Sequence, residues 1–296
     1  MKVLAVVVFY NPEGDVYKRC SLISSQVDDL IIYDNSIQPE VIKENRIITS
    51  KINNATYYGE GSNNGIGAAL NFAVSYAQEN DYKYLLTFDQ DTVIPEEYVS
   101  RMLSSFQNAP DAGVIGPIYK DVNANRECRF PVKYGPFTIR KTLSNEKGIQ
   151  NVMSIITSGT LYPTKIFKEV GCFESDYFID YIDNEFCLRL LQHGYNVYVD
   201  PSIIINHALG NRSLTKFLVK FSPTNYPFYR KYYITRNRFF VYKKYFLKFP
   251  SFIAYDFLAF SLDLFRVVIF ENDKKRKLKA YLNGFTDFIK NKKGAM

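Results

Sequence analysis

The stretch Leu85-Leu86-Thr87-Phe88-Asp89-Gln90-Asp91 is an apolar run that ends in two carboxylates spaced one residue apart. A short apolar run is typical of a buried strand, and open α/β sheets bind their ligands at the carboxyl ends of their strands. Asp89 and Asp91 are therefore candidate ligand-binding residues. The same acids also fit a structural role, as a polar strand end and as the start of a turn before a helix near Pro95. This stretch alone leaves both interpretations open.

Strand and helix signals alternate through the first hundred residues. Apolar runs at residues 2–9 and 29–36 predict buried strands, and helix-like spacing at residues 12–26 and 67–78 predicts helices between the strands. This alternation favours βαβ units and a mostly parallel sheet. Beyond it, residues 120–150 are polar with little periodicity and predict a long loop.

Three of the predicted strands end in hydrogen-bonding side chains, which are Tyr10 with Asn11, Asp34, and Asp89 with Asp91. The ends of parallel strands share one edge of a sheet, so these residues are expected to lie together. A nucleotide pocket needs such a row, because a carboxylate there accepts from a pyrimidine N–H or a ribose hydroxyl. The turn Asn63-Asn64-Gly65 would close over the sugar. Polar residues are also ordinary at strand ends, which is the alternative reading.

A second acidic group opens the predicted helix within residues 177–191. Asp180 fits an N-cap, with Asp183 three residues later as in a capping box. Asn184 and Glu185 add polar groups beyond what a cap requires, so Asp183 is a candidate general base.

Two further positions leave a structural and a functional reading open. His207 ends an apolar run; a lone histidine is usually structural, but a neutral imidazole is also a metal ligand that would join Asp91. Gly159, in a strand predicted over residues 154–161, marks either the close approach of a ligand or a bulge.

Charge is unevenly distributed in this chain of 296 residues, which has a net charge of +7 with Lys and Arg concentrated beyond residue 215. This asymmetry predicts an anionic partner for the C-terminal part, and the basic region has no nucleic-acid-binding signature. Residues 252–270 are apolar but are interrupted by Asp256, Asp263 and Arg266, which argues against a membrane span. Two readings remain: helices that lie on an anionic membrane surface, or helices packed on the rest of the protein or in a homodimer.

The four cysteines are far apart in the sequence, so neither a zinc site nor a disulfide framework is indicated. Reduced thiols predict a cytoplasmic protein. The apolar start of the chain is expected to be a buried strand and not a signal peptide. In the basic region, Arg236 and Arg238 are weak candidates for contact with an anionic ligand.

Four blocks occur in the order VVVFYNP with IIYDNS, NNGIGAALNFAV, LLTFDQDT, and YFIDYIDNEFCLRLLQHGY followed by INHALG. Together they resemble family 2 glycosyltransferases with the GT-A fold, and specifically the bacterial rhamnosyltransferase branch, over roughly residues 2–240. The resemblance implies an α/β GT-A fold, with a mostly parallel central sheet flanked by helices. It implies a catalytic domain at residues 1–215, with its nucleotide-sugar half at about 1–115 and its acceptor half at about 116–215. An aromatic and basic helical extension would follow at residues 216–296.

Position by position, the resemblance also implies roles for site residues. The residues expected to bind the nucleotide sugar are Tyr10, Asn11, Asp34, Asn64, Asp89 and Gln90. Asp91 and His207 would hold a divalent cation, Mn²⁺ or Mg²⁺, with Asp89 facing the donor ribose. Asp183 aligns with the catalytic base. The residue before the base is Glu in many members but Ile182 here, so Asp180 and Glu185 remain alternatives.

The implied reaction is an inverting transfer of L-rhamnose from dTDP-L-rhamnose to a hydroxyl of a saccharide or lipid-linked saccharide acceptor. It would serve bacterial cell-surface polysaccharide synthesis at the inner face of the cell membrane. One alternative is a UDP-hexose-dependent glycosyltransferase of the same fold. Another is a sugar-nucleotide nucleotidyltransferase, although Asn11-Pro12-Glu13-Gly14 is poorly suited to wrap a triphosphate. The third is a non-catalytic scaffold at a membrane surface.

Overall fold

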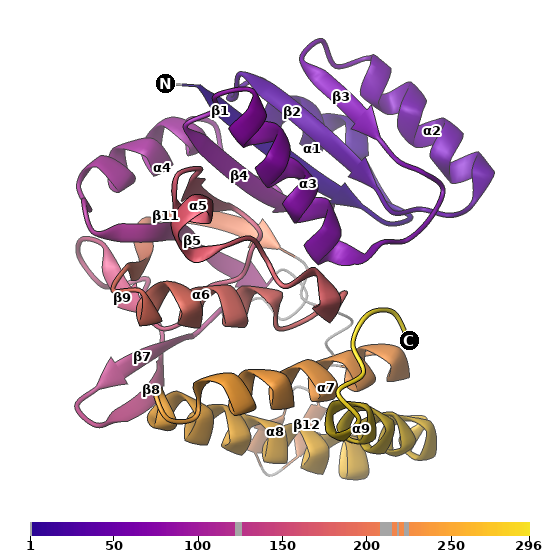
Figure 1. Ribbon diagram of the computed structural model, residues 1–296, viewed down its shortest axis with the longest axis vertical. Coiled ribbons are helices and arrows are strands. Elements are labelled where there is room, and N and C mark those ends of the chain that lie inside the picture. Colours follow the sequence, from indigo (N-terminus) through magenta and orange to yellow (C-terminus); the bar gives the residue numbers. More distant parts are fainter. Residues whose placement is uncertain (1, 122–125, 208–214, 218, 222–224) are drawn as a thin grey trace.

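The computed structural model describes residues 2–121, 126–207, 215–217, 219–221 and 225–296 (Figure 1). A mixed central sheet lies between two groups of helices, and three C-terminal helices form a further layer at the end of the molecule opposite α2 (Pro39–Ser50) and β3 (Ala55–Tyr58). In spatial order the sheet contains β3 (Ala55–Tyr58), β2 (Asp29–Asp34), β1 (Val3–Phe9), β4 (Tyr84–Asp89), β10 (Thr160–Pro163), β5 (Ala112–Asp121), β11 (Asn196–His207) and β9 (Gln150–Val152), with β6 (Arg126–Glu127) paired to β5.

The first four strands of this order are parallel to one another, as the alternation of strands and helices predicts. Next to them, β10 runs antiparallel to both of its neighbours, whereas β11 is parallel to β5. The predicted α/β fold with a mostly parallel sheet is confirmed.

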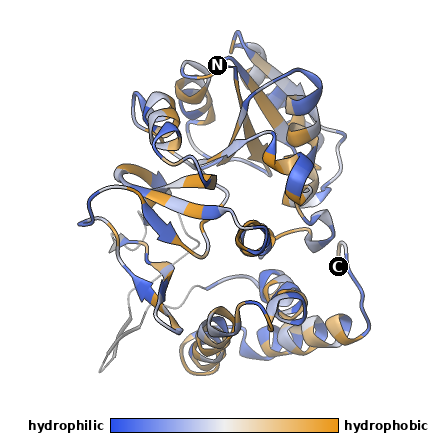
Figure 2. Cartoon of the chain, turned by 60° about the vertical axis from the view of Figure 1, so that its left-hand side comes forward, coloured by the Kyte–Doolittle hydropathy of each residue, from blue (hydrophilic) through white to orange (hydrophobic). Residues whose placement is uncertain are grey.

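Both faces of β1 are buried, which explains its unbroken apolar sequence. Leu4 and Val6 pack into one hydrophobic cluster, and Ala5 and Val7 pack into the other. The first cluster includes residues of α3 (Gly65–Glu79), α5 (Ile166–Val170) and α6 (Ile182–Gln192). The second includes residues of α1 (Val16–Ser24) and α4 (Tyr98–Gln107), and α2 (Pro39–Ser50) packs at its edge. Figure 2 shows hydrophobic residues along the strands between these helices.

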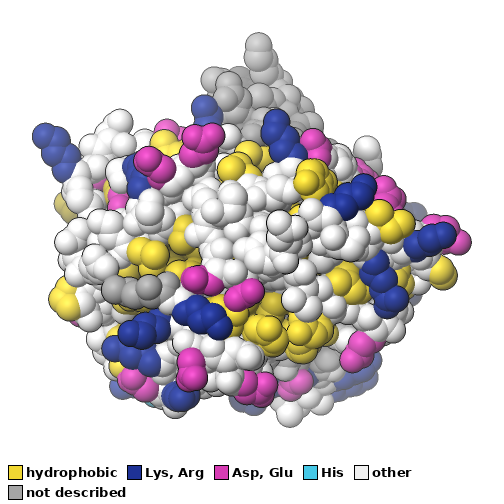
Figure 3. Space-filling model, turned by 90° about the horizontal axis from the view of Figure 1, so that it is seen from above, with side chains coloured by type: hydrophobic (Ala, Val, Ile, Leu, Met, Phe, Trp, Pro, Cys, Tyr) yellow, Lys and Arg dark blue, Asp and Glu magenta, His cyan; other side chains and the backbone are white. Residues whose placement is uncertain are grey.

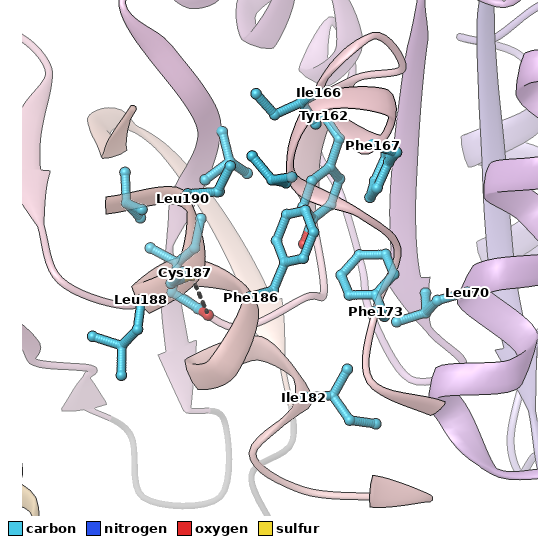
Figure 4. Packing of buried hydrophobic residues seen from close by; sticks show 14 of the residues in the cluster. Leu70, Tyr162, Ile166, Phe167, Phe173, Ile182, Phe186, Cys187, Leu188 and Leu190 are labelled. Carbon is cyan, nitrogen blue, oxygen red and sulfur yellow. Dashed lines mark hydrogen bonds between the residues drawn. The ribbon is translucent and has the colours of Figure 1, made fainter. Parts of the chain in front are cut away.

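The helix α6 is anchored by an aromatic group on the first cluster (Figure 4). Phe186 is 1% exposed, and its ring centroid lies 4.6 Å from that of Phe173 and 5.4 Å from that of Phe167. Removing such a side chain typically costs about 3–5 kcal/mol. This packing fixes the position of the helix that carries Asp183 in its first turn.

Three local predictions were wrong. Residues 120–150 contain a hairpin of β7 (Phe130–Tyr134) and β8 (Phe137–Lys141), not only a loop. Of the stretch 154–161, only residues 160 and 161 are in a strand, where they begin β10. Asp180 does not cap α6, because Tyr181 occupies the N-cap position with φ 67° and no side-chain hydrogen bond caps the helix.

The alternative left open at Gly159 is also decided by packing. Its φ is +78°, and a Cβ there would lie 2.7 Å from the Tyr98 hydroxyl and 2.8 Å from Ile205 Cδ1. The glycine therefore permits close packing of α4 and β11 against this bend, and no ligand is needed to explain it.

The C-terminal helices are α7 (Phe228–Tyr245), α8 (Pro250–Phe270) and α9 (Lys274–Ile289), and a short hairpin of β12 (Thr215–Phe217) and β13 (Val219–Phe221) precedes them. Thr138 of β8 and Ser251 of α8 form a hydrogen bond of 3.0 Å, so the β7–β8 hairpin is joined to this layer. Within the described ranges, no helix has the length and apolar character needed to cross a membrane.

Candidate active site

The carboxyl ends of β1, β2 and β4 lie side by side, as predicted. Phe9 is in register with Asp34, and Val8 is in register with Asp89. The side chain of Gln90 joins two of these ends, because its Oε1 accepts from the Tyr10 backbone N–H at 2.7 Å and its Nε2 donates to the Tyr10 carbonyl at 3.2 Å. Gln90 therefore positions the end of β1 against the acidic stretch.

Asp34 is an organised and enclosed carboxylate, with only 1% of the residue exposed. It accepts hydrogen bonds of 2.8 Å from the Ser36 backbone N–H, the Asn45 side-chain amide and the Tyr57 hydroxyl. Burial and the bond to Asp34 raise the pKa of Tyr57 to about 12. A carboxylate has about four acceptor positions, so these three donors leave room for one more.

A pocket of about 320 Å³ lies between the segment after β1 and α2, and it is linked to Asp34 through Asn45, which lines the pocket and donates to that carboxylate. Asn11 and Asn45 are among its lining residues. Asn11 has φ 48°, and its backbone N–H donates to Ser36 Oγ at 2.8 Å. Its Oδ1 is buried and has no hydrogen-bond partner, and Tyr10 beside it is 46% exposed. This pocket has the size of a small-molecule site, and one of its lining residues has a buried acceptor without a partner.

The turn before α3 joins the shared edge of β1, β2 and β4 to the segment that precedes α6. Asn35 Oδ1 accepts from the Asn64 backbone N–H at 3.0 Å, and the Ile66 N–H donates to the Phe178 carbonyl at 2.7 Å. Gly65 has φ +81°, and a Cβ there would lie 2.5 Å from the Phe178 carbonyl oxygen. Only glycine fits this contact, so the turn and the residue 178 segment are held together.

Asp89 and Asp91 are partly exposed at the end of β4. Two residues after Asp91, Val93 forms an antiparallel bridge with Asn206, with N–H···O distances of 3.2 and 3.3 Å. Antiparallel pairing sets the residues before Val93 opposite the residues after Asn206, and His207 is the next residue. The side chain of His207 lies outside the described part of the structure. Within that part, no group of three or more His, Cys, Asp or Glu residues is arranged to hold a metal ion.

Asp183 is the first-turn carboxylate of α6 and is held by its neighbour. Its Oδ1 accepts from the backbone N–H of Asn184 at 2.8 Å and from the Asn184 side-chain amide at 3.2 Å. Ser154 Oγ in turn donates to Asn184 Oδ1 at 2.7 Å. Burial, and to a lesser extent the negative charges of Asp180 and Asp89, raise the pKa of Asp183 to about 6. This carboxylate can therefore both accept and release a proton near neutral pH.

The two other acids proposed for this role are in ion pairs. Asp180 receives two hydrogen bonds from the guanidinium of Arg230. Glu185 is fully buried and pairs with Arg189 and Lys244. Burial opposes the ionised form of Glu185, but the bonds and charges of these two cations outweigh it and lower its pKa. Asp183 has no such ion pair among the described residues.

The positioning residues that sequence reasoning missed lie on α7. Asn237 Nδ2 donates to the carbonyls of Tyr177, Ile179 and Asp180 at 2.9, 2.9 and 3.0 Å. Arg236 is fully buried and donates to the carbonyls of Asp176 and Tyr177. In the sequence, Arg236 and Asn237 lie in a run of aromatic and basic residues, and nothing there distinguishes them from their neighbours. Neither Arg236 nor Arg238 is available to an anionic ligand. Arg236 is buried and bonded to carbonyl groups, and Arg238 pairs with Asp256.

The sequence pattern described as Glycosyl transferase family 2 matches residues 5–171, which is more than half of the chain. The chain belongs to this family. The acids at the carboxyl ends of the strands are therefore part of a glycosyltransferase, and the protein is an enzyme of this class.

A relative in Shigella flexneri, dTDP-rhamnosyl transferase RfbF, is 29% identical over 255 residues, covering 82% of this chain and 80% of its own length. Among solved structures, residues 1–349 of S. aureus TarS match 98% of this chain and 81% of their own with a TM-score of 0.61 at 12% identity. The mannosyltransferase PcManGT from Pyrobaculum calidifontis, in complex with GDP-Man and Mn²⁺, matches 100% of this chain and 76% of its own with a TM-score of 0.59 at 12% identity. These structures share the fold.

The raised pKa of Asp183 predicts how its loss affects stability at different pH values. A carboxylate whose pKa is higher in the folded than in the unfolded state favours folding below the unfolded pKa of 3.8, and this contribution is lost as the pH rises through about 6. Asp183→Asn should therefore raise the melting temperature relative to wild type more at pH 7.5 than at pH 4.5.

Thermal unfolding followed by circular dichroism at the two pH values measures this difference. Asp15→Asn is the matched control, because Asp15 caps α1 by accepting from the Lys18 N–H at 3.0 Å and should show no such gain at the higher pH. If Asp183→Asn is instead less stable than wild type at pH 7.5, the main effect of the Asp183 carboxylate is to stabilise the N-terminus of α6.

Proposed function

We propose that the enzyme transfers L-rhamnose from dTDP-L-rhamnose to a hydroxyl of a saccharide or lipid-linked saccharide acceptor in the synthesis of bacterial surface polysaccharide. The observation that carries the proposal is the similarity to a dTDP-rhamnosyl transferase over 82% of the chain. Because the chain belongs to a glycosyltransferase family, a nucleotidyltransferase and a non-catalytic scaffold are no longer competitive alternatives. A UDP-hexose donor remains the second candidate, to be separated by experiment.

The nucleotide would occupy the shared edge of β1, β2 and β4. The pocket beside Asn11 and the remaining acceptor position of Asp34 suit a pyrimidine ring and its ribose. Tyr10 offers an exposed aromatic face at this edge, and the Asn64 turn would close over the sugar. Asp89 would face the ribose.

The proposed reaction is a single displacement with inversion. Asp183 takes the proton of the acceptor hydroxyl, and the oxygen then attacks the anomeric carbon as the nucleoside diphosphate departs. The pKa of Asp183, about 6, suits a general base near neutral pH. The fixed Oδ1 of Asp183 would keep the carboxylate oriented for this step.

The chemistry of the side chains at the end of β4 fits a divalent cation, Mn²⁺ or Mg²⁺. We propose that Asp91 and His207 hold it, since carboxylate and imidazole are suitable ligands and the Val93–Asn206 bridge brings their segments together. When bound, such a cation neutralises charge on the departing diphosphate. In the structural relative PcManGT, Mn²⁺ accompanies GDP-Man.

A donor panel tests the proposed function. The protein is incubated with Mn²⁺ or Mg²⁺ and with dTDP-rhamnose, UDP-glucose, UDP-galactose or UDP-GlcNAc, and release of the nucleoside diphosphate is followed. We expect release from dTDP-rhamnose above the other donors, and dependence on the cation. Preferential release from a UDP-sugar would replace the donor assignment, and release from none would contradict the proposal.

Two variants in the same assay separate the proposed roles. Asp183→Asn should keep dTDP-rhamnose binding and lose turnover by about 100-fold to 10,000-fold, the usual range for a general base. Asp91→Asn should instead weaken metal-dependent binding of the donor itself. Turnover by Asp183→Asn at the wild-type rate would exclude it as the base.

The outer face of α8 supports a membrane-surface location. Its exposed apolar side chains recur at helical spacing and are 42–61% exposed; they are Phe257, Leu258, Leu262, Phe265, Val268 and Ile269. The exposed Lys274, Lys275 and Arg276 follow directly at the start of α9. An apolar stripe next to cations is typical of a helix that lies on an anionic membrane, whereas a homodimer interface would not require the cations. The opposite end of the molecule, seen in Figure 3, has charges of both signs interspersed.

Vesicle co-sedimentation tests this location. Binding should be stronger to vesicles with anionic lipid than to neutral ones, and the double variant Leu258→Gln, Leu262→Gln should lose most of it. Ile47→Gln, which changes an apolar residue 48% exposed on α2, is the control. Absence of vesicle binding together with a stable dimer in light scattering would assign the stripe to a second copy of the chain.

A further inference from the structure

A second pocket, of about 170 Å³, opens at Asp183. Its walls come from α6, the β7–β8 hairpin and α8, so it lies between the sheet and the C-terminal helices. Asp183 and Asn184 form one side of it, and Tyr119, Phe252 and Tyr255 supply aromatic side chains. The volume is below that of a typical drug-sized site and suits a single sugar ring against aromatic faces. If Asp183 is the base of the proposed function, the acceptor hydroxyl must enter here.

Two arginines line the same pocket. Arg140 lies on β8 in register with Pro131, which is also a lining residue, and Arg129 is two residues before Pro131 in the chain. Cross-strand and diagonal neighbours of this kind have side chains about 5–8 Å apart at their bases. The two guanidinium groups are therefore within reach of one small anion.

Neither arginine is neutralised by another residue in the described part of the chain. Among the described residues, Arg129 and Arg140 form no ion pair, and both side chains are exposed. The pocket is also lined by Asp256, but this carboxylate forms an ion pair with Arg238 at 2.9 Å. It also accepts hydrogen bonds of 2.8 Å from the hydroxyls of Tyr181 and Tyr242. Asp183 lies on the other side of the pocket, where the reacting hydroxyl is needed. The rim at the β7–β8 hairpin thus has two cations, and no carboxylate of the described residues forms an ion pair with either of them.

We propose that the acceptor carries a phosphate or diphosphate group on the sugar that receives the new linkage, and that Arg129 and Arg140 bind this group. The inference rests on the proposed function, since it takes Asp183 as the base. Guanidinium groups bind phosphate through paired, charge-assisted hydrogen bonds, which makes arginine the fitting residue for this task.

The reaction leaves this anion unchanged. The acceptor O–H proton passes to Asp183, a bond forms between that oxygen and the anomeric carbon of the donor, and the bond from this carbon to the donor phosphate breaks. The electron pair leaves with the donor nucleoside diphosphate. The acceptor phosphate serves to orient the sugar, with its hydroxyl toward Asp183 and its anionic end at the hairpin.

The position of α8 would allow the phosphate group to come from a lipid-linked sugar as well as from a free sugar phosphate. One side of α8 contributes Phe252 and Tyr255 to the pocket, and its other side carries the exposed apolar stripe. A sugar joined to a lipid through diphosphate would place its sugar in the pocket and its lipid near this helix. A free sugar phosphate has the same anionic chemistry without the lipid.

The test is a binding measurement that does not depend on turnover. N-acetylglucosamine 1-phosphate and glucose 1-phosphate are titrated against the methyl glycosides of the same sugars by calorimetry. Saturating dTDP and Mn²⁺ are present to occupy the donor site. We expect the phosphates to bind at least 10-fold more tightly than the methyl glycosides. A geranyl-diphosphate-linked N-acetylglucosamine is the third probe, and its tighter binding would identify the lipid-linked source.

The double variant Arg129→Gln, Arg140→Gln should reduce the advantage of the phosphates to less than 3-fold and leave dTDP binding unchanged. The control Lys147→Gln, Lys168→Gln removes the same charge from exposed side chains outside the pocket and should keep the advantage. Equal binding of phosphates and methyl glycosides, no binding of either, or an advantage that survives in the arginine variant would overturn the inference. A failed donor panel with a preserved, arginine-dependent phosphate preference would contradict the proposed function alone.

Discussion

The segment that leads into α6 keeps its shape because buried polar side chains of α7 hold its carbonyl groups. Phe178, Asp180 and Tyr181 all have positive φ, at 66°, 65° and 67°. Such conformations cost about 1–3 kcal/mol each for residues other than glycine and persist only where the surroundings enforce them. The enforcing contacts are the hydrogen bonds from Arg236 and Asn237 to the carbonyls of Tyr177, Ile179 and Asp180. The helix α7 therefore belongs to the structure that holds the candidate site in place.

The charges around the site follow from the same arrangement. The buried guanidinium of Arg236 is satisfied by carbonyls and by the rings of Tyr232 and Tyr233, which lie 5.3 and 5.0 Å from it. Arg230, on the same helix, pairs with Asp180. Lys244, near the end of the helix, pairs with Glu185. One helix thus neutralises two of the three acids near the start of α6, and Asp183 is left with a raised pKa.

Much of the part of the sheet that contains β1, β2 and β4 could be predicted from the sequence, because it depends on local signals. The apolar runs that became β1, β2 and β4 are buried on both faces, and such strands carry their end residues to one edge. The β7–β8 hairpin was missed, although Phe130 and Val132 are spaced two residues apart and Gly135-Pro136 marks the turn. The roles of Gln90, Arg236 and Asn237 could not be found, since each contacts a segment 57 to 80 residues away.

The central claim is that α7 holds the segment before Asp183 in its strained shape, and amide hydrogen exchange in Asn237→Ala measures this most directly. The amides of Tyr177, Phe178 and Glu185 are hydrogen bonded within this region. Their exchange should accelerate at least 10-fold in the variant, while exchange in β1, β2 and β4 stays at the wild-type rate. Asn272→Ala, at an exposed position between α8 and α9, should leave all of these rates unchanged. Unchanged exchange of these three amides in Asn237→Ala would contradict the account.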